Sequence, residues 1–312
     1  MCGVILILGV LCQFRFMMKK FIYFIFLALL VVSCEPKSTQ LFSKLDAAKT
    51  GVDFKNKLTE THKYNYFTYP YMYLGGGVSV GDVNNDGLED IFFTGNMVAN
   101  KLYLNKGNLE FEDISESAGI TGDERWYSGT TFVDINQDGY LDIYCSVGGK
   151  NGPNNNVLYI NNQDNTFTEK AAEYGIDCDG ISMQSTFFDY DKDGDLDLYV
   201  INYPPTSFTA PVEYYQYMLD NHEIKDSDRL YRNDNGKFTD VTVEAGLSSF
   251  GLSLGVVASD VNNDGYTDIF VSNDFNAPDF LFINNQDGTF TNQINTSLQQ
   301  ISFFGMGADI AD

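Results

Sequence analysis

Short apolar segments recur along the chain, separated by polar segments that contain glycine. The clearest apolar segments occupy positions 91–93, 143–145, 198–200 and 269–271. A second apolar run follows each of these and ends in Asn105, Asn161, Asn233 or Asn284. A phenylalanine comes next in each repeat, at Phe111, Phe167, Phe238 and Phe290. With an apolar run such as 78–80 at the start of the group, this pattern predicts four short β-strands per repeat.

An acidic segment stands between the first and second predicted strands and repeats almost residue for residue. Its four copies lie at 82–90, 134–142, 189–197 and 260–268. Successive copies start 52, 55 and 71 residues apart. Every copy has Asp at positions 1, 5 and 9, Gly at position 6, and Asn or Asp at position 3. Repetition at this period indicates an array of similar structural units.

A fifth copy is expected at the end of the chain. Gly77, Gly129 and Gly255 each stand five residues before the first Asp of a copy, and Gly307 stands five residues before Asp312. Asp312 also follows the first Asp of the fourth copy by 52 residues. We therefore expect Asp312 to begin a fifth acidic loop, with the protein continuing beyond it.

Four-stranded units at this period are typical of the blades of a β-propeller, so the predicted fold class is all-β, with about seven blades in the complete protein. A stacked solenoid is the alternative. The predicted boundaries are 61–120, 121–176, 177–247 and 248–299 for blades 1 to 4, and 300–312 for the start of blade 5. Residues 35–60 are predicted to be a linker and a ring-closing outer strand, because 41–52 resembles 238–247. An outer strand from the other end of the chain would hide a sheet edge.

The acidic segments have the donor pattern of calcium loops. Calcium takes six to eight oxygen ligands from carboxylates, amides, backbone carbonyls and water. The side chains at positions 1, 3, 5 and 9 and the backbone carbonyl at position 7 are expected to face one cation, while glycine at position 6 permits a sharp turn. The predicted ligands are Asp82, Asn84, Asp86, Leu88 and Asp90; Asp134, Asn136, Asp138, Tyr140 and Asp142; Asp189, Asp191, Asp193, Asp195 and Asp197; Asp260, Asn262, Asp264, Tyr266 and Asp268; and Asp312.

These loops differ from EF-hands, which need a glutamate at position 12. Position 12 is apolar here and belongs to the following strand, at Phe93, Cys145, Val200 and Val271. An ordinary Asn-Asp-Gly turn without metal is the alternative. Several carboxylates in one loop repel each other unless a cation neutralises them, so we expect about one Ca²⁺ per blade.

The start of the chain has the features of a signal peptide. Lys19 and Lys20 precede an apolar run at 21–32, which is shorter than the roughly 20 residues of a membrane-spanning helix. Residues 31–34, Val-Val-Ser-Cys, resemble the lipobox of bacterial lipoproteins, which implies cleavage before Cys34 and its lipidation. We expect Met18 to be the true start, residues 1–34 to be the signal peptide, and the protein to be anchored to the outer membrane. An uncleaved anchor helix is the alternative.

The body of the chain contains only two cysteines, Cys145 and Cys178, which are too few for a disulfide framework. Cys145 takes a strand position that valine fills in two other repeats, so we expect it to be buried.

The long third spacing indicates an insertion at 202–228. Long ordered loops often carry function, and exposed tyrosines can stack on sugars or anchor a protein partner. The candidate ligand contacts are Tyr203, Phe208, Tyr214, Tyr215 and Tyr217. Packing of these aromatic residues against the blade, through a short helix, is the alternative.

The acidic loops within four-stranded repeats resemble the FG-GAP/VCBS repeats of integrin α-chain propellers and bacterial surface proteins. Residues 75–87, Gly-Gly-Gly-Val-Ser-Val-Gly-Asp-Val-Asn-Asn-Asp-Gly, resemble more closely the bacterial relatives of cartilage acidic protein, which usually end in an ASPIC/UnbV domain. The resemblance covers 41–312 and implies an extracytoplasmic protein that binds or adheres. Fold alone does not determine function.

Two functions from different classes follow. The first is a binding or adhesion module for a glycan or protein; the second is an extracytoplasmic carbohydrate-active enzyme of lyase type. A lyase would need a basic residue in a central cleft, and the candidates are Arg125, Lys192 and Arg229. The two histidines, His62 and His222, show no nucleophile–base spacing, and a structural spacer is a third option. The net charge of -24 argues against nucleic acid as a partner.

Overall fold

The computed structural model describes residues 41–150, 152–204, 211–221, 225, 227–275 and 277–311. The chain divides into two units, Met1–Leu45 and Asp46–Asp312, and the second unit contains every sheet of the described chain. The expected signal peptide, its Cys34 and the expected fifth-loop residue Asp312 lie outside the described residues and stay predictions. Among the residues that the structure describes, no helix has both the length and the apolar character needed to cross a bilayer.

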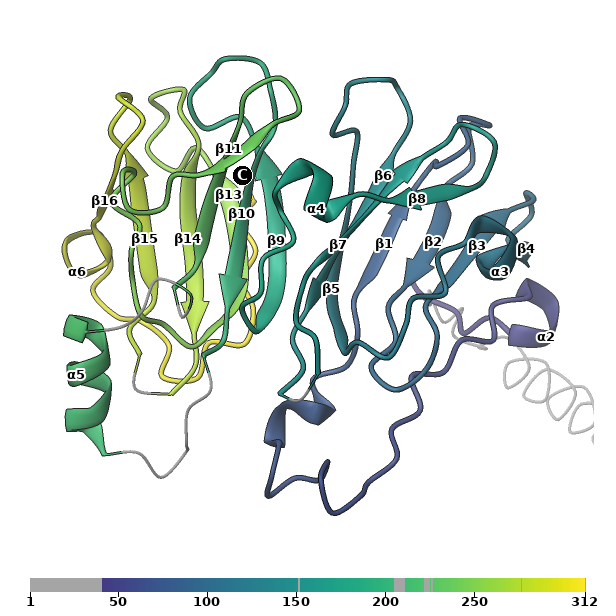
Figure 1. Ribbon diagram of the computed structural model, residues 1–312, viewed down its shortest axis with the longest axis horizontal. Coiled ribbons are helices and arrows are strands. Elements are labelled where there is room, and N and C mark those ends of the chain that lie inside the picture. Colours follow the sequence, from purple (N-terminus) through teal and green to yellow (C-terminus); the bar gives the residue numbers. More distant parts are fainter. Residues whose placement is uncertain are drawn as a thin grey trace, which may run out of the picture. The chain divides into compact units, whose positions relative to one another are not determined.

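Four antiparallel sheets of four strands follow one another along the chain (Figure 1). Within each sheet the strands pair in chain order. The sheets are β1 (Val78–Gly81), β2 (Asp90–Phe93), β3 (Lys101–Asn105) and β4 (Phe111–Asp113); β5 (Tyr127–Val133), β6 (Asp142–Val147), β7 (Val157–Asn161) and β8 (Phe167–Glu169); β9 (Ser182–Phe188), β10 (Asp197–Asn202), β11 (Arg229–Asn233) and β12 (Phe238–Asp240); and β13 (Ser253–Ser259), β14 (Asp268–Asn273), β15 (Phe280–Asn284) and β16 (Phe290–Asn292). This arrangement confirms the predicted all-β propeller fold, and the sheets are called blades 1 to 4 below.

The apolar core lies between neighbouring blades. Along β6, Ile143 and Cys145 pack with side chains of blade 1, whereas Tyr144 packs with side chains of blade 3. A second strand covered on both faces has no polar face, which explains why these segments are continuously apolar instead of alternating. Cys145 is fully buried in this core, as predicted.

The first strands of the blades lie side by side, with β5 next to β1 and β9, and β9 next to β13. A Cβ atom on Gly77 would lie 2.7 Å from the backbone nitrogen of Thr130, and one on Gly129 would lie 2.6 Å from the carbonyl oxygen of Met183. Each glycine before a loop therefore allows two blades to approach closely. Gly307 stands in the same relation to blade 4, because a Cβ on Gly255 would lie 2.8 Å from its Cα.

A short helical turn follows the outer strand of most blades, as in α3 (Ser115–Ala118), α4 (Ala171–Tyr174) and α6 (Ile294–Ser297). The first two end at Gly119 and Gly175, whose positive φ angles suit glycine. The turn α2 (Ala47–Thr50) ends likewise at Gly51, on which a Cβ would lie 2.3 Å from the carbonyl oxygen of Phe111. Residues 46–51 thus lie against blade 1 as α4 and Gly175 lie against Phe238 of blade 3.

Residues 41–46 form no strand in the described chain. A strand at this position would need the third strand of a further blade as its hydrogen-bonding neighbour. The ring-closing strand and the exact blade boundaries therefore stay predictions.

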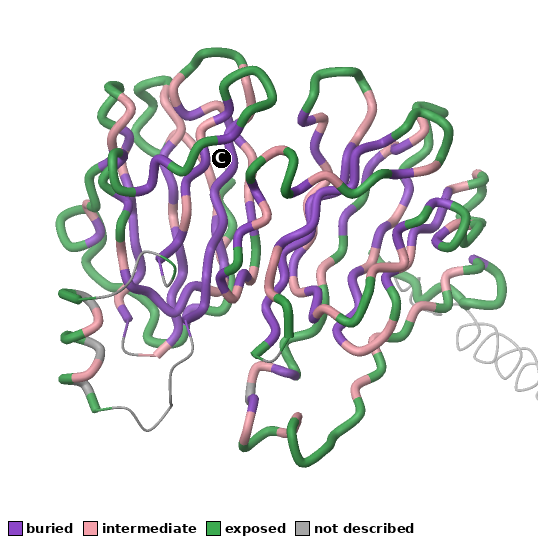
Figure 2. The backbone as a smooth tube through the Cα atoms, in the orientation of Figure 1, coloured by how far each residue is buried: buried purple, intermediate pink, exposed green. Residues whose placement is uncertain are grey.

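The two ends of the blades carry different features. At the loop end, the acidic loops join the first and second strands of each blade. At the strap end, residues 54–77, here called the strap, run from blade 1 towards blade 4 and include the 3-10 helix η1 (Pro70–Tyr73). The insertion helix α5 (Val212–Asn221) lies at the strap end too (Figure 1). Figure 2 shows that the loops and much of the strap are exposed, whereas the strands between them are largely buried.

The strap contacts every blade. Phe54 stacks on Phe93 of blade 1 with ring centroids 4.9 Å apart. The Tyr69 hydroxyl donates to the Gly148 carbonyl after β6 of blade 2 (2.7 Å). The Tyr71 hydroxyl donates to Asp274 Oδ2 after β14 of blade 4 (2.6 Å) and accepts from the Tyr203 hydroxyl after β10 of blade 3.

Candidate calcium loops

The first residue of each acidic loop shapes the loop backbone. In the first copy, Asp82 Oδ1 accepts a hydrogen bond from the Asp86 backbone N–H (3.1 Å), and Oδ2 accepts one from the Gly87 N–H (2.7 Å). Asp86 Oδ1 then accepts from the Leu88 N–H at 2.9 Å. The same bonds recur in the second and fourth copies. Gly87 has φ of 86°, a conformation that residues with a Cβ rarely adopt.

The ninth residue of each loop is buried at the start of the second strand. Asp142 Oδ2 accepts from the Ile135 N–H within the loop (3.2 Å), and Oδ1 accepts from the Asn161 N–H at the end of the third strand (2.8 Å). Asp90, Asp197 and Asp268 make the equivalent pairs of bonds. These carboxylates therefore hold the loop, the second strand and the third strand together.

Burial makes the charge on these ninth residues costly. Desolvation raises the pKa of Asp142 and of Asp197 to about 7, against the opposing effect of their backbone hydrogen bonds. The negative charges of Asp138 and Asp134 raise the pKa of Asp142 further. Burial likewise raises the pKa values of Asp90 and Asp268. A cation beside these groups would favour their ionised forms.

The third loop offers the strongest test of whether the residues fit a metal ion. One carboxylate oxygen from each of Asp189, Asp191 and Asp197 lies within 4.8 Å of the other two. Asp189 Oδ1 is buried and has no hydrogen-bond partner among the described residues. Carboxylate oxygens this close together, one of the residues having a buried oxygen without a partner in the described chain, suit Ca²⁺, so the residues fit the expected ion.

The structure places the remaining predicted ligands in the same loops. The position-7 residues Leu88, Tyr140, Asp195 and Tyr266 donate their backbone N–H groups to the position-5 carboxylates. The Asp195 side chain is directed elsewhere, since Oδ2 accepts from the Asn235 N–H (2.8 Å) and Oδ1 from Gln137 Nε2 (3.2 Å).

The aromatic residues of the insertion are divided between core and surface. Tyr203 is buried, and Tyr214 packs with it, with Met218 and with Phe250. Tyr217 on the same helix has 61% of its surface exposed. Phe208 lies outside the described residues, and the side chain of Tyr215 is not described. Packing thus accounts for Tyr203 and Tyr214, and Tyr217 is the exposed candidate for ligand contact.

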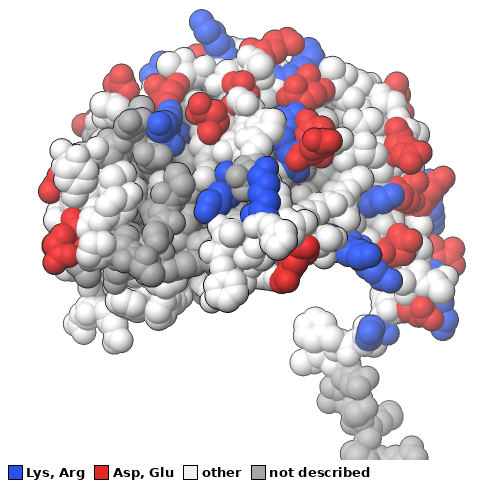
Figure 3. Space-filling view, turned by 60° about the horizontal axis from the view of Figure 1, so that its bottom comes forward, with Lys and Arg blue, Asp and Glu red and all other residues white. Residues whose placement is uncertain are grey.

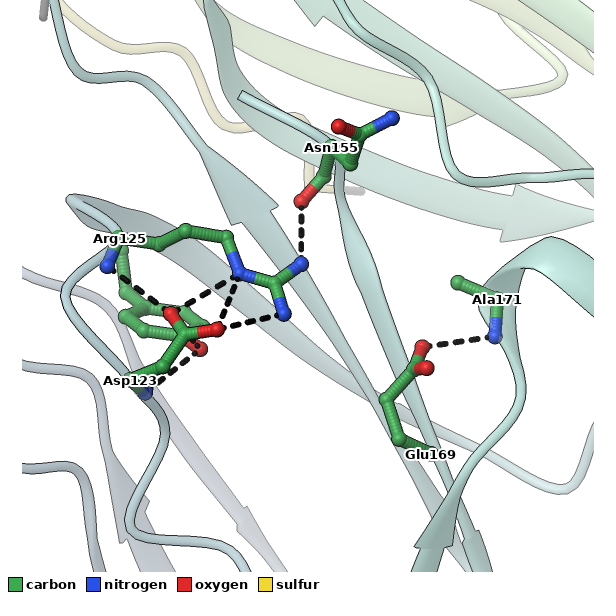
Figure 4. Close-up of polar contacts among 6 residues, drawn as sticks. Asp123, Arg125, Asn155, Glu169 and Ala171 are labelled. Carbon is green, nitrogen blue, oxygen red and sulfur yellow. Dashed lines mark hydrogen bonds and ion pairs between the residues drawn. The ribbon is translucent and has the colours of Figure 1, made fainter. Parts of the chain in front are cut away.

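The basic residues considered for a lyase each have partners in the described structure. Figure 4 shows the Arg125 guanidinium directed at Asp123 and at the Asn155 carbonyl, and Glu169 directed at the backbone nitrogen of Ala171. Arg229 pairs with Asp240, and Lys192 Nζ lies 4.3 Å from the ring centroid of Tyr266. The bonds to Arg125 lower the pKa of Asp123. Each residue is thus accounted for by local contacts.

Two sets of residues were not found from the sequence. One is a row at the strap end, just before the third strand of each blade, made of Asn100, Asn156, Asp228 and Asp279. Each accepts a backbone N–H at or just beyond the end of the second strand, at 2.8 or 2.9 Å. The other set is position 4 of the loops, which contacts the next loop. Both sets occur at the same position of successive repeats, and this recurrence in the sequence could have revealed them.

Charge is distributed unevenly over the surface. Figure 3 brings the strap end forward, and Lys and Arg side chains gather near the middle of this view, whereas Asp and Glu lie mostly around it. A hollow of about 500 Å³ at this end is lined by residues that include Tyr64, Met97, Arg125 and Trp126.

The sheets and loops together define a β-propeller protein built from repeats that each carry an acidic loop. The FG-GAP-like repeat family matches residues 82–145, 146–200, 220–271 and 260–312, so the chain belongs to this family.

The chain is similar in sequence to cartilage acidic protein 1 from three animals. The mouse protein is 26% identical over 203 residues, and the human protein is 26% identical over 206 residues; each match covers 64% of this chain and 28% of the relative. The Xenopus tropicalis protein is 30% identical over 131 residues, covering 42% of this chain and 20% of the relative. The chain therefore spans less than a third of the length of these relatives.

Among solved structures, a Photorhabdus luminescens Tc holotoxin pore aligns with 70% of this chain and 9% of that chain. Its sequence identity is 16% and its TM-score is 0.31, which is too low to support a conclusion.

Proposed function

We propose that this chain is a calcium-binding β-propeller of the cell envelope that acts as a binding or adhesion module for a glycan or a protein. The observation that carries the proposal is the third loop, where three carboxylates converge and one buried oxygen has no described partner. The other loops have Asp at the same positions 1, 5 and 9 and a glycine of positive φ at position 6, which supports about one Ca²⁺ per blade. In that role the ion neutralises the loop carboxylates and stiffens the first hairpin of each blade.

Thermal unfolding in calcium, in magnesium and in excess chelator tests whether the protein binds calcium. Calcium at about 100 times its dissociation constant adds roughly 2.7 kcal/mol for each independent site. We expect a large rise in Tm with calcium and a much smaller one with magnesium, which prefers a smaller octahedral site. Equal Tm values in calcium and chelator would show that the acidic loops are metal-free turns.

The ligand surface is proposed to include the exposed face of α5. Tyr217 supports this, since an exposed aromatic side chain can stack on a sugar or anchor a protein. Binding to a glycan array and to envelope proteins can be compared for the wild type and Tyr217→Ala. Tyr73→Ala is the matched control, because Tyr73 is an exposed tyrosine (49%) at the same end but outside the insertion. Equal binding by all three proteins would remove α5 from the ligand surface.

We also propose a lipid anchor at Cys34, which rests on the sequence of residues 31–34. The substitution Cys34→Ala is expected to remove the protein from the outer-membrane fraction, which cell fractionation measures. A wild-type protein without an acyl mass at its N-terminus would contradict the anchor.

The protein is proposed to be non-enzymatic, because no specific observation favours the lyase alternative. Incubation with acidic polysaccharides in calcium is expected to release no unsaturated products. Product release that is lost in chelator and in Arg125→Ala would instead establish the enzyme.

A further inference from the structure

Residues at position 4 connect each acidic loop to the next one. Asn85 Nδ2 of the first loop donates to the Gly139 carbonyl of the second loop at 2.8 Å. Gln137 Nε2 of the second loop donates to the Gly194 carbonyl of the third loop at 3.0 Å. Both are neutral amides that reach the position-6 carbonyl of the next blade. Position 4 therefore forms a series of links between neighbouring cation loops.

The link from the third loop to the fourth differs in charge. Position 4 of the third loop is Lys192, whose Nζ lies 4.3 Å from the ring centroid of Tyr266, the position-7 residue of the fourth loop. A Cβ on Gly265, at position 6, would lie 3.3 Å from the same nitrogen. The ammonium group thus occupies the place where Asn85 and Gln137 present an amide.

This ammonium group also acts on the fourth loop's own carboxylates. Asp264 Oδ1 accepts a hydrogen bond from the Tyr266 N–H at 2.8 Å, and Lys192 lies over the ring of the same tyrosine. Lys192 therefore supplies part of the positive charge that a cation would otherwise bring. It also repels any cation that enters the loop.

The third loop has more negative charge among its donor side chains than the other three loops. It has Asp191 at position 3, where the other loops have Asn84, Asn136 and Asn262, so it has one more carboxylate among its donor side chains. Calcium affinity in oxygen-donor loops rises with the number of charged ligands.

We infer that the four loops bind calcium with graded affinity, the third most tightly because of Asp191 and the fourth most weakly because Lys192 of the neighbouring blade lies against it. This inference rests on the proposed calcium binding. Asp191 and Lys192 are the two residues that separate the calcium affinities of the loops. Blade 4 then loses its ion first as calcium falls, while blade 3 keeps its ion longest.

The chain supplies matched variants, since each substitution installs the residue found at the same position of another loop. Lys192→Asn restores the amide of the first loop, and we expect the weakest calcium-binding step to become about three- to tenfold tighter. Asp191→Asn is expected to weaken the tightest step by about tenfold. Asn85→Lys places an ammonium group beside Tyr140 of the second loop and is expected to weaken one further step.

Isothermal titration of calcium into the whole protein after chelator treatment gives the stepwise affinities. Raising the salt from about 0.01 M to about 1 M shortens the screening length from about 30 Å to 3 Å, so the effect of Lys192→Asn should shrink. Asp264→Asn assigns the step, because Lys192→Asn should have little effect once the fourth loop has lost that carboxylate. Circular dichroism of each variant in chelator checks that the fold is kept.

The outcomes separate this inference from the proposed function. No calcium heat from the wild type would overturn the proposed calcium binding and this inference with it. Calcium binding with the same isotherm for the wild type and Lys192→Asn would overturn the inference alone. A tightened weak step that persists in the Asp264→Asn background would overturn the assignment to the fourth loop.

Discussion

The second strand of every blade is held at both of its ends by a buried carboxyl or amide group that accepts a backbone N–H, but the two ends use different residues. At the loop end the residue is always aspartate: Asp90, Asp142, Asp197 and Asp268. At the strap end it is asparagine in blades 1 and 2 and aspartate in blades 3 and 4: Asn100, Asn156, Asp228 and Asp279.

The hydrogen-bond partners explain the difference. Both oxygens of Asp197 accept backbone N–H groups, from Tyr190 (3.0 Å) and Asn233 (2.8 Å). An asparagine here would point its NH₂ group at one of these donors. Only one oxygen of Asp228 meets a backbone donor, while the other faces the hydroxyls of Ser253 and Tyr199, which can donate or accept.

Blade 2 shows that an amide side chain can make all the hydrogen bonds at the strap end. Asn156 Oδ1 accepts the Val147 N–H at 2.8 Å, and Nδ2 donates to the Tyr144 and Ser182 hydroxyls, both at 3.0 Å. In blade 1, Phe92 takes the place of Tyr144, and Asn100 Nδ2 has no partner among the described residues. A carboxylate is therefore required only at the loop end, where two backbone donors and the proposed cation need it.

Asp197→Asn is expected to have the largest effect. In saturating calcium the unfolding free energy should fall by about 4 kcal/mol, because the third site is lost and a buried N–H loses its acceptor. In chelator the loss should be smaller, since Asn also removes a desolvated charge that no cation neutralises. Urea unfolding in both conditions measures the two values, and equal losses would contradict a role for Asp197 in metal binding.

Asp228→Asn is expected to stabilise the protein above neutral pH. Burial raises the pKa of Asp228 to about 7, above the roughly 3.9 of an unfolded chain, so the folded protein holds this proton between the two values. The contribution of Asp228 is thus full below about pH 4 and is lost as pH rises through 7. The variant has no such loss and should be about 4 kcal/mol more stable at pH 8, and close to the wild type at pH 4.

Unfolding measured across pH at constant calcium checks this expectation. The reciprocal variant Asn156→Asp should lose stability as pH rises, because it places a carboxyl group in the equivalent buried position. A pH-independent difference between Asp228→Asn and the wild type would show that Asp228 does not titrate in this range.

Tyr71→Phe is expected to weaken the strap by about 1–2 kcal/mol, because a hydrogen bond to a carboxylate is lost while the ring is kept. The Tyr71 hydroxyl donates to Asp274 and accepts from Tyr203, so it joins the strap to the ends of blades 3 and 4. Tyr73→Phe is the control, since Tyr73 bonds Glu60 within the strap at the surface. Equal Tm values for Tyr71→Phe and Tyr73→Phe would contradict the proposed role of the Tyr71 hydroxyl.

Asn85→Gly is expected to have the smallest effect, about 0.5 kcal/mol, because it removes an exposed bond between loops. Glycine keeps the positive φ of 58° at this position without strain. Asn85→Ala should cost about 1 kcal/mol more because alanine tolerates this conformation poorly. Equal stabilities of the two variants would show that backbone conformation contributes little here.

The sequence by itself determined the features that repeat locally. The strands at 91–93 and 143–145, the glycine turns and the candidate ligand positions of the loops follow from patterns a few residues long, and such patterns constrain the backbone directly. Asp90 and its three equivalents could be named as candidate ligands because each stands in a fixed place between loop and strand, whereas their burial came from the structure.

Only the tertiary structure decided how separated segments meet. The contact of Tyr71 with Asp274 joins residues 203 positions apart, and no local pattern encodes that pairing. The burial of Tyr203, the hydroxyls around Asp228 and the ammonium of Lys192 beside Tyr266 likewise depend on which blade is the neighbour. Local periodicity specifies each blade, whereas contacts between blades arise only when the blades pack together.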